Sequence, residues 1–209
     1  MTLLGRLVSF FPLAHALLIF YAVLCFVRHP GWALLLWLFG VTYLMPPMLW
    51  RLYSLKYPMR SERVLLSGTM RCHWWVAHQL QMVYAAVPFL EAFLRLIPGV
   101  YSAWLRLWGS RIGRSVYWTV QVELLDRHLL HIGDGVIFGH RSQCSSHIIA
   151  RKPNRDLVLV AKAVCIGDGV FVGAGARIGP GVKIPTGVVI PYNAEYRFSY
   201  VESVVHTTC

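Results

Sequence analysis

Apolar residues recur at every sixth position along the C-terminal half of the chain. The clearest run is IGDGVFVGAGARIGPGVKIPTGVVIP, in which the recurring residues are Ile166, Val172, Ile178, Ile184 and Ile190. An α-helix repeats its apolar face every 3.6 residues and a strand every two, so neither element by itself fits this spacing. The pattern predicts a coil of short parallel strands, in which three six-residue units close one triangular rung.

Glycines follow the same spacing three positions later. They stand at Gly169, Gly175, Gly181 and Gly187. Glycine adopts backbone angles that other residues avoid, so we expect a tight bend at each of these positions. The next position in each unit holds a residue small enough to share the narrow interior of a coil: Val170, Ala176, Val182 and Val188.

The six-residue spacing continues towards the N-terminus with one interruption. It predicts earlier rungs that open with Ile112, Trp118 and Leu124, then Ile132, Phe138 and Cys144, then Val160, Ile166 and Val172, before the last rung at Ile178, Ile184 and Ile190. Residues 150–159, ARKPNRDLVL, break the spacing and predict a loop that leaves the coil. The predicted β-helix covers residues 109–191, and residues 192–209 form a C-terminal tail.

These repeats resemble those of the hexapeptide-repeat acyltransferases, over roughly residues 109–191. The resemblance implies a left-handed parallel β-helix, whereas the spacing predicts the rungs but not their hand. It also implies a homotrimer with active sites in the clefts between neighbouring subunits. The sequence itself indicates only that so short a coil, with open ends and exposed faces, needs caps or partners.

The N-terminal part of the chain holds two long apolar runs. Residues 7–27 and residues 32–50 contain no Asp, Glu, Lys or Arg, and a short turn, RHPG, separates them. Each run is long enough to cross the ~30 Å hydrocarbon core of a bilayer as a helix. We therefore predict a two-span transmembrane hairpin in residues 1–60. The alternative is a buried hairpin of a soluble protein, although soluble helices carry a polar face.

The basic residues predict how such a hairpin is oriented. One precedes the first run and four follow the second: Arg6, then Arg51, Lys56, Arg60 and Arg63. The positive-inside rule then predicts a multi-pass protein of the bacterial cytoplasmic membrane, with its catalytic domain in the cytoplasm. Residues 61–108 are predicted to be amphipathic interfacial helices, capped by Ser61 and broken near Pro88. A third span in residues 61–96 is the alternative.

The chain is strongly basic, with 20 Lys and Arg against 9 Asp and Glu and a net charge of +11. This charge suits a protein that rests on anionic lipid headgroups and binds a phosphate-bearing donor. It would also suit nucleic-acid binding. No nucleic-acid-binding motif accompanies it, so we expect no nucleic-acid partner.

Two histidines beside the predicted loop are candidate catalytic residues. His140 and His147 fall at corner positions of their units, where side chains point outward. A neutral imidazole can take the proton of an attacking hydroxyl or amine. Counting by units places Asp168 one rung from His140, where a carboxylate would fix the imidazole tautomer. From the residues alone the two histidines are about equal candidates.

The resemblance favours His147. In the branch that includes the galactoside and maltose O-acetyltransferases, a histidine stands immediately before a loop that interrupts the coil, and the coil resumes with a unit like IGDNVWIG. This chain reads CSSHIIARKPNRD and then AKAVCIGDGVFVG, which gives His147 the general-base position. The match departs at Phe171, where the family has tryptophan. The soluble members lack the apolar runs, so their acceptors do not carry over.

The resemblance also implies the acyl donor, which is coenzyme A or acyl carrier protein. The pantetheine arm of this donor lies in the family along the groove beside the later rungs. There the chain offers backbone groups and cations at Gly173, Ala174, Lys162, Arg177 and Lys183. The donor is a co-substrate, so we expect no permanently bound cofactor and no metal site.

The sequence thus predicts a membrane-anchored acyltransferase. It would move an acyl group from acyl-CoA or acyl carrier protein to a hydroxyl or amine of a small or lipid-like acceptor, by direct attack with a histidine base. Two alternatives stay open. A zinc hydratase of the γ-carbonic anhydrase type shares the coil but needs three converging imidazoles. A non-catalytic membrane scaffold would use the coil as a rigid spacer.

Overall fold

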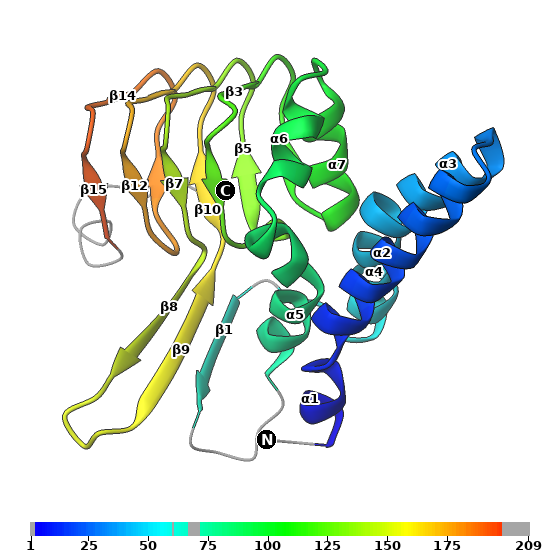
Figure 1. Ribbon diagram of the computed structural model, residues 1–209. Coiled ribbons are helices and arrows are strands. Elements are labelled where there is room, and N and C mark those ends of the chain that lie inside the picture. Colours follow the sequence, from blue (N-terminus) through cyan, green and yellow to red (C-terminus); the bar gives the residue numbers. More distant parts are fainter. Residues whose placement is uncertain (1–2, 60, 67–71, 198–209) are drawn as a thin grey trace.

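A computed structural model describes residues 3–59, 61–66 and 72–197. Figure 1 shows the helices of the N-terminal half on one side and a coil of short stacked strands on the other, with a two-stranded arm projecting from the coil. The first helices are α1 (Leu3–Val8), α2 (Phe11–Arg28), α3 (Trp32–Phe39), a π-helical turn (Gly40–Leu44) and α4 (Met45–Lys56).

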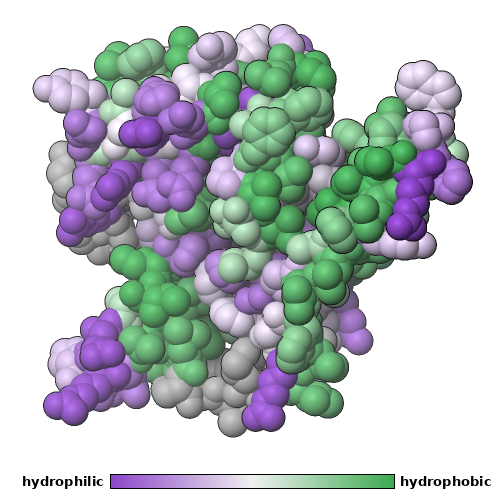
Figure 2. Space-filling view, in the orientation of Figure 1, coloured by the Kyte–Doolittle hydropathy of each residue, from purple (hydrophilic) through white to green (hydrophobic). Residues whose placement is uncertain are grey.

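Helix α2 and the helix that runs from α3 through α4 form a hairpin (Figure 1). Two stretches are long and apolar enough to cross a membrane, Gly5–Arg28 with 24 residues and Trp32–Lys56 with 25. Most of their side chains are exposed, and Figure 2 shows hydrophobic residues along the hairpin. These are the properties of a membrane hairpin, and equally of a helix pair that a partner covers.

A Pro-Pro pair near the start of α4 determines how the hairpin joins the rest of the molecule. Prolines have no N–H, so the carbonyls of Thr42 and Tyr43, four residues earlier, lose their helical partners. Other side chains replace those donors. The Tyr84 hydroxyl donates to the Thr42 carbonyl at 2.6 Å, and Trp104 Nε1 donates to the Tyr43 carbonyl at 2.8 Å. These two bonds tie the hairpin to the helices that follow.

Those helices are α5 (His73–Ala86), α6 (Phe89–Arg95) and α7 (Val100–Trp108). The predicted break near Pro88 is confirmed, because α5 ends before it and α6 begins after it. The predicted helical start at Ser61 is wrong, since Ser61–Leu65 forms the strand β1. Its partner is β9, about a hundred residues later, so local sequence could not reveal it. Within the described residues, only the hairpin contains helices long enough to span a membrane.

The coil is built of three four-stranded parallel sheets, and α7 leads into its base. The first sheet contains β2 (Arg111–Ile112), β5 (Leu130–Ile132), β10 (Val164–Ile166) and β13 (Lys183–Ile184). The second contains β3 (Tyr117–Trp118), β6 (Ile137–Phe138), β11 (Phe171–Val172) and β14 (Val189–Ile190). The third contains β4 (Glu123–Leu124), β7 (Gln143–Cys144), β12 (Arg177–Ile178) and β15 (Glu195–Tyr196). The predicted coil of parallel strands is confirmed.

The grouping of the strands into rungs differs from the prediction. Strand register stacks Ile132 on Ile166 and Ile166 on Ile184, so the third rung opens at Ile166 and not at Val160. Val160 lies in β9 of the arm. The fourth rung closes with Tyr196, which pairs with Ile178, so the coil continues beyond Pro191. Val160 fits the six-residue spacing only because it lies six positions before Ile166, on the strand of the arm that returns to the coil.

The sequence predicts a loop over residues 150–159, but half of this segment is strand. β8 (His147–Arg151) and β9 (Leu157–Lys162) pair antiparallel, and β1 adds a third strand to β9. Only residues 152–156 form the turn. Ile148 and Ile149 are about half exposed, and Figure 2 shows the arm as a hydrophobic surface that ends in a hydrophilic tip.

The predicted glycine bends are confirmed. Gly169, Gly175, Gly181 and Gly187 have φ angles of 62°, 70°, 72° and 73°, in the left-handed region that favours glycine. Gly173 is required for a different reason. A Cβ at this residue would lie 2.6 Å from the backbone of the rung above, at Ile190 and Tyr192. The fourth rung can therefore stack closely on Gly173 only because this residue carries no side chain.

Candidate active site

His147 lies where the arm leaves the coil. Each rung turns from the third sheet into the first at what we call the arm corner, formed by residues 125–129, 145–163 and 179–182. His147 is the first residue of β8 and pairs with Ala161 of β9. Its side chain is 17% exposed, so the ring is neither sealed inside the coil nor surrounded by solvent.

His147 is bonded to a buried carboxylate. Its Nδ1 atom lies 2.8 Å from Oδ2 of Asp126, whose side chain is 1% exposed and which belongs to the first rung. In a neutral ring, a hydrogen on Nδ1 leaves a lone pair on Nε2. No described residue is hydrogen-bonded to Nε2. The pair therefore presents a proton-accepting nitrogen beside the arm.

Asp126 is held from three sides. Besides the His147 ring, its Oδ2 accepts the backbone N–H of Ser146 at 2.8 Å, and its Oδ1 accepts Nε1–H of Trp74 at 2.8 Å. Burial opposes the charged form, but the bond and charge of His147, together with His128 and Trp74, hold the pKa of Asp126 below its ordinary value. The carboxylate is therefore ionised at neutral pH and its orientation is determined.

Helix α5 forms the opposite wall of the site. The Trp74 ring lies 4.4 Å from the His147 ring, centroid to centroid, and 4.6 Å from the ring of His78. His78 and His147 are 6.2 Å apart. The carboxylate of Glu62, on β1, caps α5 by accepting the N–H groups of His73 at 2.9 Å and Trp74 at 2.7 Å. The capping bonds position this wall.

A second buried carboxylate ties the same corner to the helices. Glu91 on α6 accepts hydrogen bonds from Arg127, with Nε at 2.7 Å, from Arg95 at 2.9 Å and from the hydroxyl of Tyr101. Gln81 on α5 also accepts the backbone N–H of Arg127 at 2.7 Å. Because Arg127 follows Asp126 directly, this network determines where the arm corner sits against α5 and α6.

The structure does not bring the other two predicted catalytic residues together. His140 is exposed at the corner between the second and third sheets, and its backbone carbonyl bonds to Gly175. Asp168 lies at the corner between the first and second sheets, where its Oδ1 accepts the N–H of Asp134 at 2.7 Å. Asp168 thus stacks on Asp134, and the predicted pairing with His140 is wrong. The carboxylate that orients a histidine is Asp126.

The predicted donor-binding residues lie on several faces of one coil. Lys162 ends β9 and donates its N–H to the carbonyl of Ser146, so it belongs to the arm corner. Arg177 and Lys183 point outward from the third and first sheets, which meet at that corner. Gly173 and Ala174 lie at the corner between the second and third sheets. The five residues thus share neither one sheet nor one corner of the coil.

Lys183 lines a cavity of about 590 Å³ on the outer face of the first sheet. The outward residues of its four strands, Arg111, His131, Cys165 and Lys183, line this cavity. Asp168 lines it as well, so two cations stand against one carboxylate and the cavity is basic overall. Burial, and then Arg111, lower the pKa of His131, so the positive charge at neutral pH comes from the arginine and the lysine. Such a surface suits a phosphate-bearing ligand.

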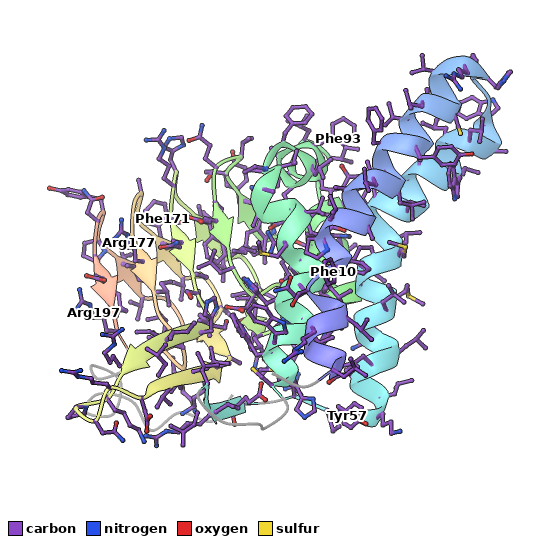
Figure 3. All side chains as sticks on the ribbon, turned by 60° about the horizontal axis from the view of Figure 1, so that its bottom comes forward. Phe10, Tyr57, Phe93, Phe171, Arg177 and Arg197 are labelled. Atoms are coloured by element: carbon purple, nitrogen blue, oxygen red, sulfur yellow. The ribbon has the colours of Figure 1, made fainter. Side chains whose placement is uncertain are left out.

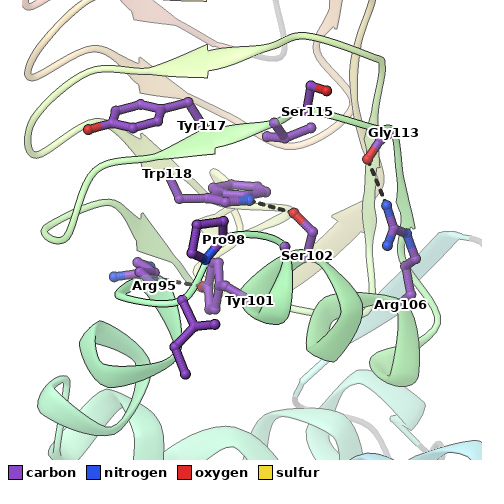
Figure 4. A pocket seen from close by; sticks show the side chains of 12 residues that line it. Arg95, Pro98, Tyr101, Ser102, Arg106, Gly113, Ser115, Tyr117 and Trp118 are labelled. Atoms are coloured by element: carbon purple, nitrogen blue, oxygen red, sulfur yellow. Dashed lines mark hydrogen bonds between the residues drawn. The ribbon is translucent and has the colours of Figure 1, made fainter.

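A second cavity, of about 420 Å³, lies between the α6–α7 connection and the first rung (Figure 4). Many of its polar groups already bond to protein. Trp118 Nε1 donates to Ser102 at 2.9 Å, and Arg106 donates to the Gly113 carbonyl at 2.7 Å. This cavity marks the joint between helices and coil. Neither of these two cavities includes His147.

Sequence reasoning missed Asp126, Trp74 and His78. The sequence did contain a signal for Asp126. Ile112 and Ile132 stack on each other, so one turn of the coil takes 20 residues here, and the same count places residue 126 under residue 146. No such signal existed for Trp74 and His78, which reach the corner through the docking of α5. Chemically, the assembled group is a histidine base with a buried carboxylate behind it.

No protein-family model matches the chain, and no curated protein matches its sequence. Among solved structures, the chain is similar to a hexapeptide-repeat-containing acetyltransferase from Vibrio cholerae, with 18% identity and a TM-score of 0.36 over 54% of this chain and 86% of that one. The strand pairings of this chain define its fold independently of that likeness.

Proposed function

We propose that the chain is a membrane-anchored acyltransferase. It takes an acyl group from acyl-CoA or acyl carrier protein and transfers it to a hydroxyl or amine of a small or lipid-like acceptor. The observation that carries this proposal is the bond between His147 and the buried Asp126, at the corner of a six-residue-repeat coil. The resemblance of the repeats to hexapeptide-repeat acyltransferases supplies the reaction class.

The proposed reaction needs no covalent enzyme intermediate. The acceptor oxygen or nitrogen attacks the thioester carbonyl carbon while Nε2 of His147 takes its proton. The carbonyl electrons move to oxygen, and when they return the C–S bond breaks. His147 then gives its proton to the leaving sulfur, which restores the neutral ring. A positioned general base of this kind contributes on the order of 10² to 10⁴ in rate.

Asp126 has two functions in this scheme. Its bond to Nδ1 keeps the lone pair of His147 on Nε2, and its charge stabilises the imidazolium that forms during attack. Burial strengthens both effects, because a charge is screened less inside the protein than in water. The same carboxylate would be ineffective if it were neutral, and its lowered pKa keeps it charged.

The basic cavity of the first sheet is the proposed site for the donor phosphates. Arg111 and Lys183 line it, and the first sheet adjoins the arm corner that holds His147. Guanidinium and ammonium groups bind phosphates through charge-assisted hydrogen bonds. The donor is a co-substrate in this proposal, with no cofactor bound permanently.

The hairpin is the proposed membrane anchor, with both ends in the cytoplasm of a bacterial cell. Its two apolar stretches have the necessary length, and four basic residues lie at or just beyond the end of the second stretch, at positions 51, 56, 60 and 63. Phe89, Phe93 and Leu96 of the α6 region are exposed, and Figure 3 places Phe93 at the edge of the molecule beside the hairpin. Such a helix suits the interface between lipid headgroups and acyl chains.

A homotrimer is proposed because one face of the coil is apolar and uncovered. The outward residues of the second sheet align across all four rungs and are 41% to 67% exposed: Tyr117, Ile137, Phe171 and Val189. A contiguous apolar stripe is typical of an interface.

Light scattering of the detergent-solubilised protein tests the trimer. We expect the mass of a trimer for the wild-type protein and the mass of a monomer for the Ile137→Lys variant. A trimeric variant would show that this stripe is not the interface.

The alternatives make different predictions. A zinc hydratase needs three converging ligands, and the described residues contain no group of three His, Cys, Asp or Glu that could hold a metal ion. Metal analysis of the purified protein tests it directly. A non-catalytic scaffold would not turn over thioesters at all.

The test is acyl transfer by the purified full-length protein. Radiolabelled acetyl-CoA and palmitoyl-CoA are incubated with an extract of bacterial lipids and small molecules, and products are followed by released thiol and by mass. We expect an acceptor to gain one acyl group, and His147→Ala to lower the rate by ~10² to 10⁴. Full activity in His147→Ala would refute the general base. No thiol release by the wild-type chain would favour the scaffold.

A further inference from the structure

A second imidazole reaches the site from the helical half of the chain. His78 lies four residues after Trp74 on α5, so both side chains project from the same face of that helix. The interplanar angle between His78 and His147 is 69°, so the edge of one ring faces the other. No described residue is hydrogen-bonded to either ring nitrogen of His78. Its hydrogen-bonding groups are therefore available to a substrate.

The ring of His78 is held in place by stacking. It lies nearly parallel to the Trp74 ring, with an interplanar angle of 21°, and Trp75 packs 5.9 Å away. Trp74 is itself bonded to Asp126 through its side chain and to Glu62 through its backbone. One rigid ring thus positions both histidines.

The three ring centroids form a triangle whose sides are 4.4, 4.6 and 6.2 Å. These lengths make the angle at Trp74 close to a right angle, so His78 and His147 lie on two adjacent sides of the Trp74 ring. Hydrogen bonds to oxygen are about 2.8 Å long. The separation of the histidine rings therefore suits a small reacting group that touches both of them.

The charge of His78 also suits this position. Burial, and then the neighbouring His147, lower the pKa of His78, while Asp126 acts in the opposite direction and Arg127 in the same one. The ring is therefore neutral at pH 7 and carries one N–H donor. A second cation here would oppose the positive charge that His147 acquires during attack. A neutral donor does not.

Building on the acyltransferase function, we propose that His78 donates a hydrogen bond to the acyl carbonyl oxygen as it becomes an oxyanion. The acceptor attacks the carbonyl carbon, the π electrons move to oxygen, and His147 takes the acceptor proton. When the electrons return, the C–S bond breaks and the sulfur receives that proton. The hydrogen of His78 stays on its nitrogen throughout. His78 is thereby a catalytic residue supplied by the α-helical half.

The test compares His78→Leu, which removes the donor, with His78→Gln, which keeps an N–H. His73→Gln is the matched control, because it removes another half-buried imidazole from α5 whose partner is Tyr53. Thiol release from acetyl-CoA is measured with the full-length protein and a bacterial lipid extract. We expect kcat of His78→Leu to fall on the order of 10², the usual loss for one oxyanion donor, with KM for acetyl-CoA unchanged. His78→Gln should recover part of the loss, and His73→Gln should keep wild-type kcat.

Wild-type kcat in His78→Leu would overturn the inference, and so would an equal loss in His78→Gln and His78→Leu. If circular dichroism shows that His78→Leu does not fold, the folded His78→Gln variant is measured in its place. A kcat below the wild-type value at unchanged KM then supports the inference, and a wild-type kcat overturns it. His147→Ala is measured in parallel to separate the two proposals. An inactive His147→Ala with an active His78→Leu refutes only the inference, whereas an active His147→Ala refutes the acyltransferase mechanism itself.

Discussion

Nδ1 of His147 lies 2.8 Å from a carboxylate oxygen of Asp126, a residue 21 positions earlier in the chain. The two residues belong to successive rungs of the coil and meet at the same corner. The backbone N–H of Ser146 bonds to the same oxygen at 2.8 Å. The histidine and the carboxylate that orients it are therefore brought together by one turn of the coil.

Replacing Asp126 by Asn should reduce kcat strongly. It should also weaken the corner, because the carboxylate accepts on both oxygens and the amide has only one acceptor oxygen. The amide keeps the shape of the side chain, but it has no charge to stabilise the imidazolium and no longer specifies the hydrogen on Nδ1. We expect a loss towards the upper end of the ~10² to 10⁴ range of general-base catalysis, measured as thiol release from acyl-CoA.

Asp134→Asn is the control for this prediction. Asp134 is also a corner aspartate, and it accepts the N–H of Arg114 at 2.6 Å, but it lies at a different corner from His147. Its variant should keep the wild-type rate. Equal losses in the two variants would mean that Asp126 acts only through the stability of the coil.

Replacing Trp74 by Phe should destabilise the protein by about 1.5–3 kcal/mol, since a buried carboxylate loses one of its hydrogen-bond donors. The ring that stacks on the histidines is largely retained. Denaturant unfolding in detergent at pH 7 measures the loss. Trp75→Phe on the same helix removes a weaker bond to the Gly5 carbonyl, at 3.3 Å. A similar destabilisation by both variants would contradict the assigned bond.

Acid should destabilise the fold through His128. Burial lowers the pKa of this histidine to about 4, from an ordinary value of 6.5. Between these values the unfolded chain binds the proton and the folded chain does not, so stability is present above pH 6.5 and is lost as the pH falls towards 4. One such group accounts for about 3 kcal/mol over this window.

The free energy of unfolding at pH 7 and at pH 5 measures this dependence, and His128→Gln should flatten it. His78 has a lowered pKa as well and contributes with the same sign, so some dependence should persist in the variant. The lowered pKa of Asp126 affects stability only at more acid pH, below its ordinary value of 3.8. An unchanged slope in His128→Gln would refute the assignment.

The turn of the proposed membrane hairpin and the tip of the arm should label from opposite sides of the membrane. His29 is exposed at the turn between α2 and α3, and Lys152 is exposed at the tip of the arm. In a cytoplasmic membrane with both hairpin ends inside, a cysteine at position 29 should react with an impermeant maleimide in spheroplasts. A cysteine at position 152 should react only after lysis. Labelling of both sites without lysis, relative to the wild-type chain, would contradict the orientation.

Much of the coil was predictable because its physical constraint is periodic. An inward position comes once per unit and must be apolar, and a bend that needs a positive φ selects glycine, as at Gly169 and Gly175. The apolar helices were predictable for a similar reason, since a long uncharged run is visible without knowledge of its contacts. The position of His147 beside an interruption of the repeat followed from the same counting.

The sequence by itself thus determined the six-residue strand repeat, the glycine bends, the two apolar helices and the fact that the coil is interrupted soon after His147. Only the tertiary structure decided that Val160 belongs to the arm, that Ser61 starts a strand, and that Trp74 and His78 of α5 reach His147. Those outcomes depend on contacts between segments that lie far apart along the chain, such as β1 with β9 and α5 with the arm corner. Such contacts leave no periodic trace, because each is made once, by side chains whose partners are chosen by docking and not by spacing.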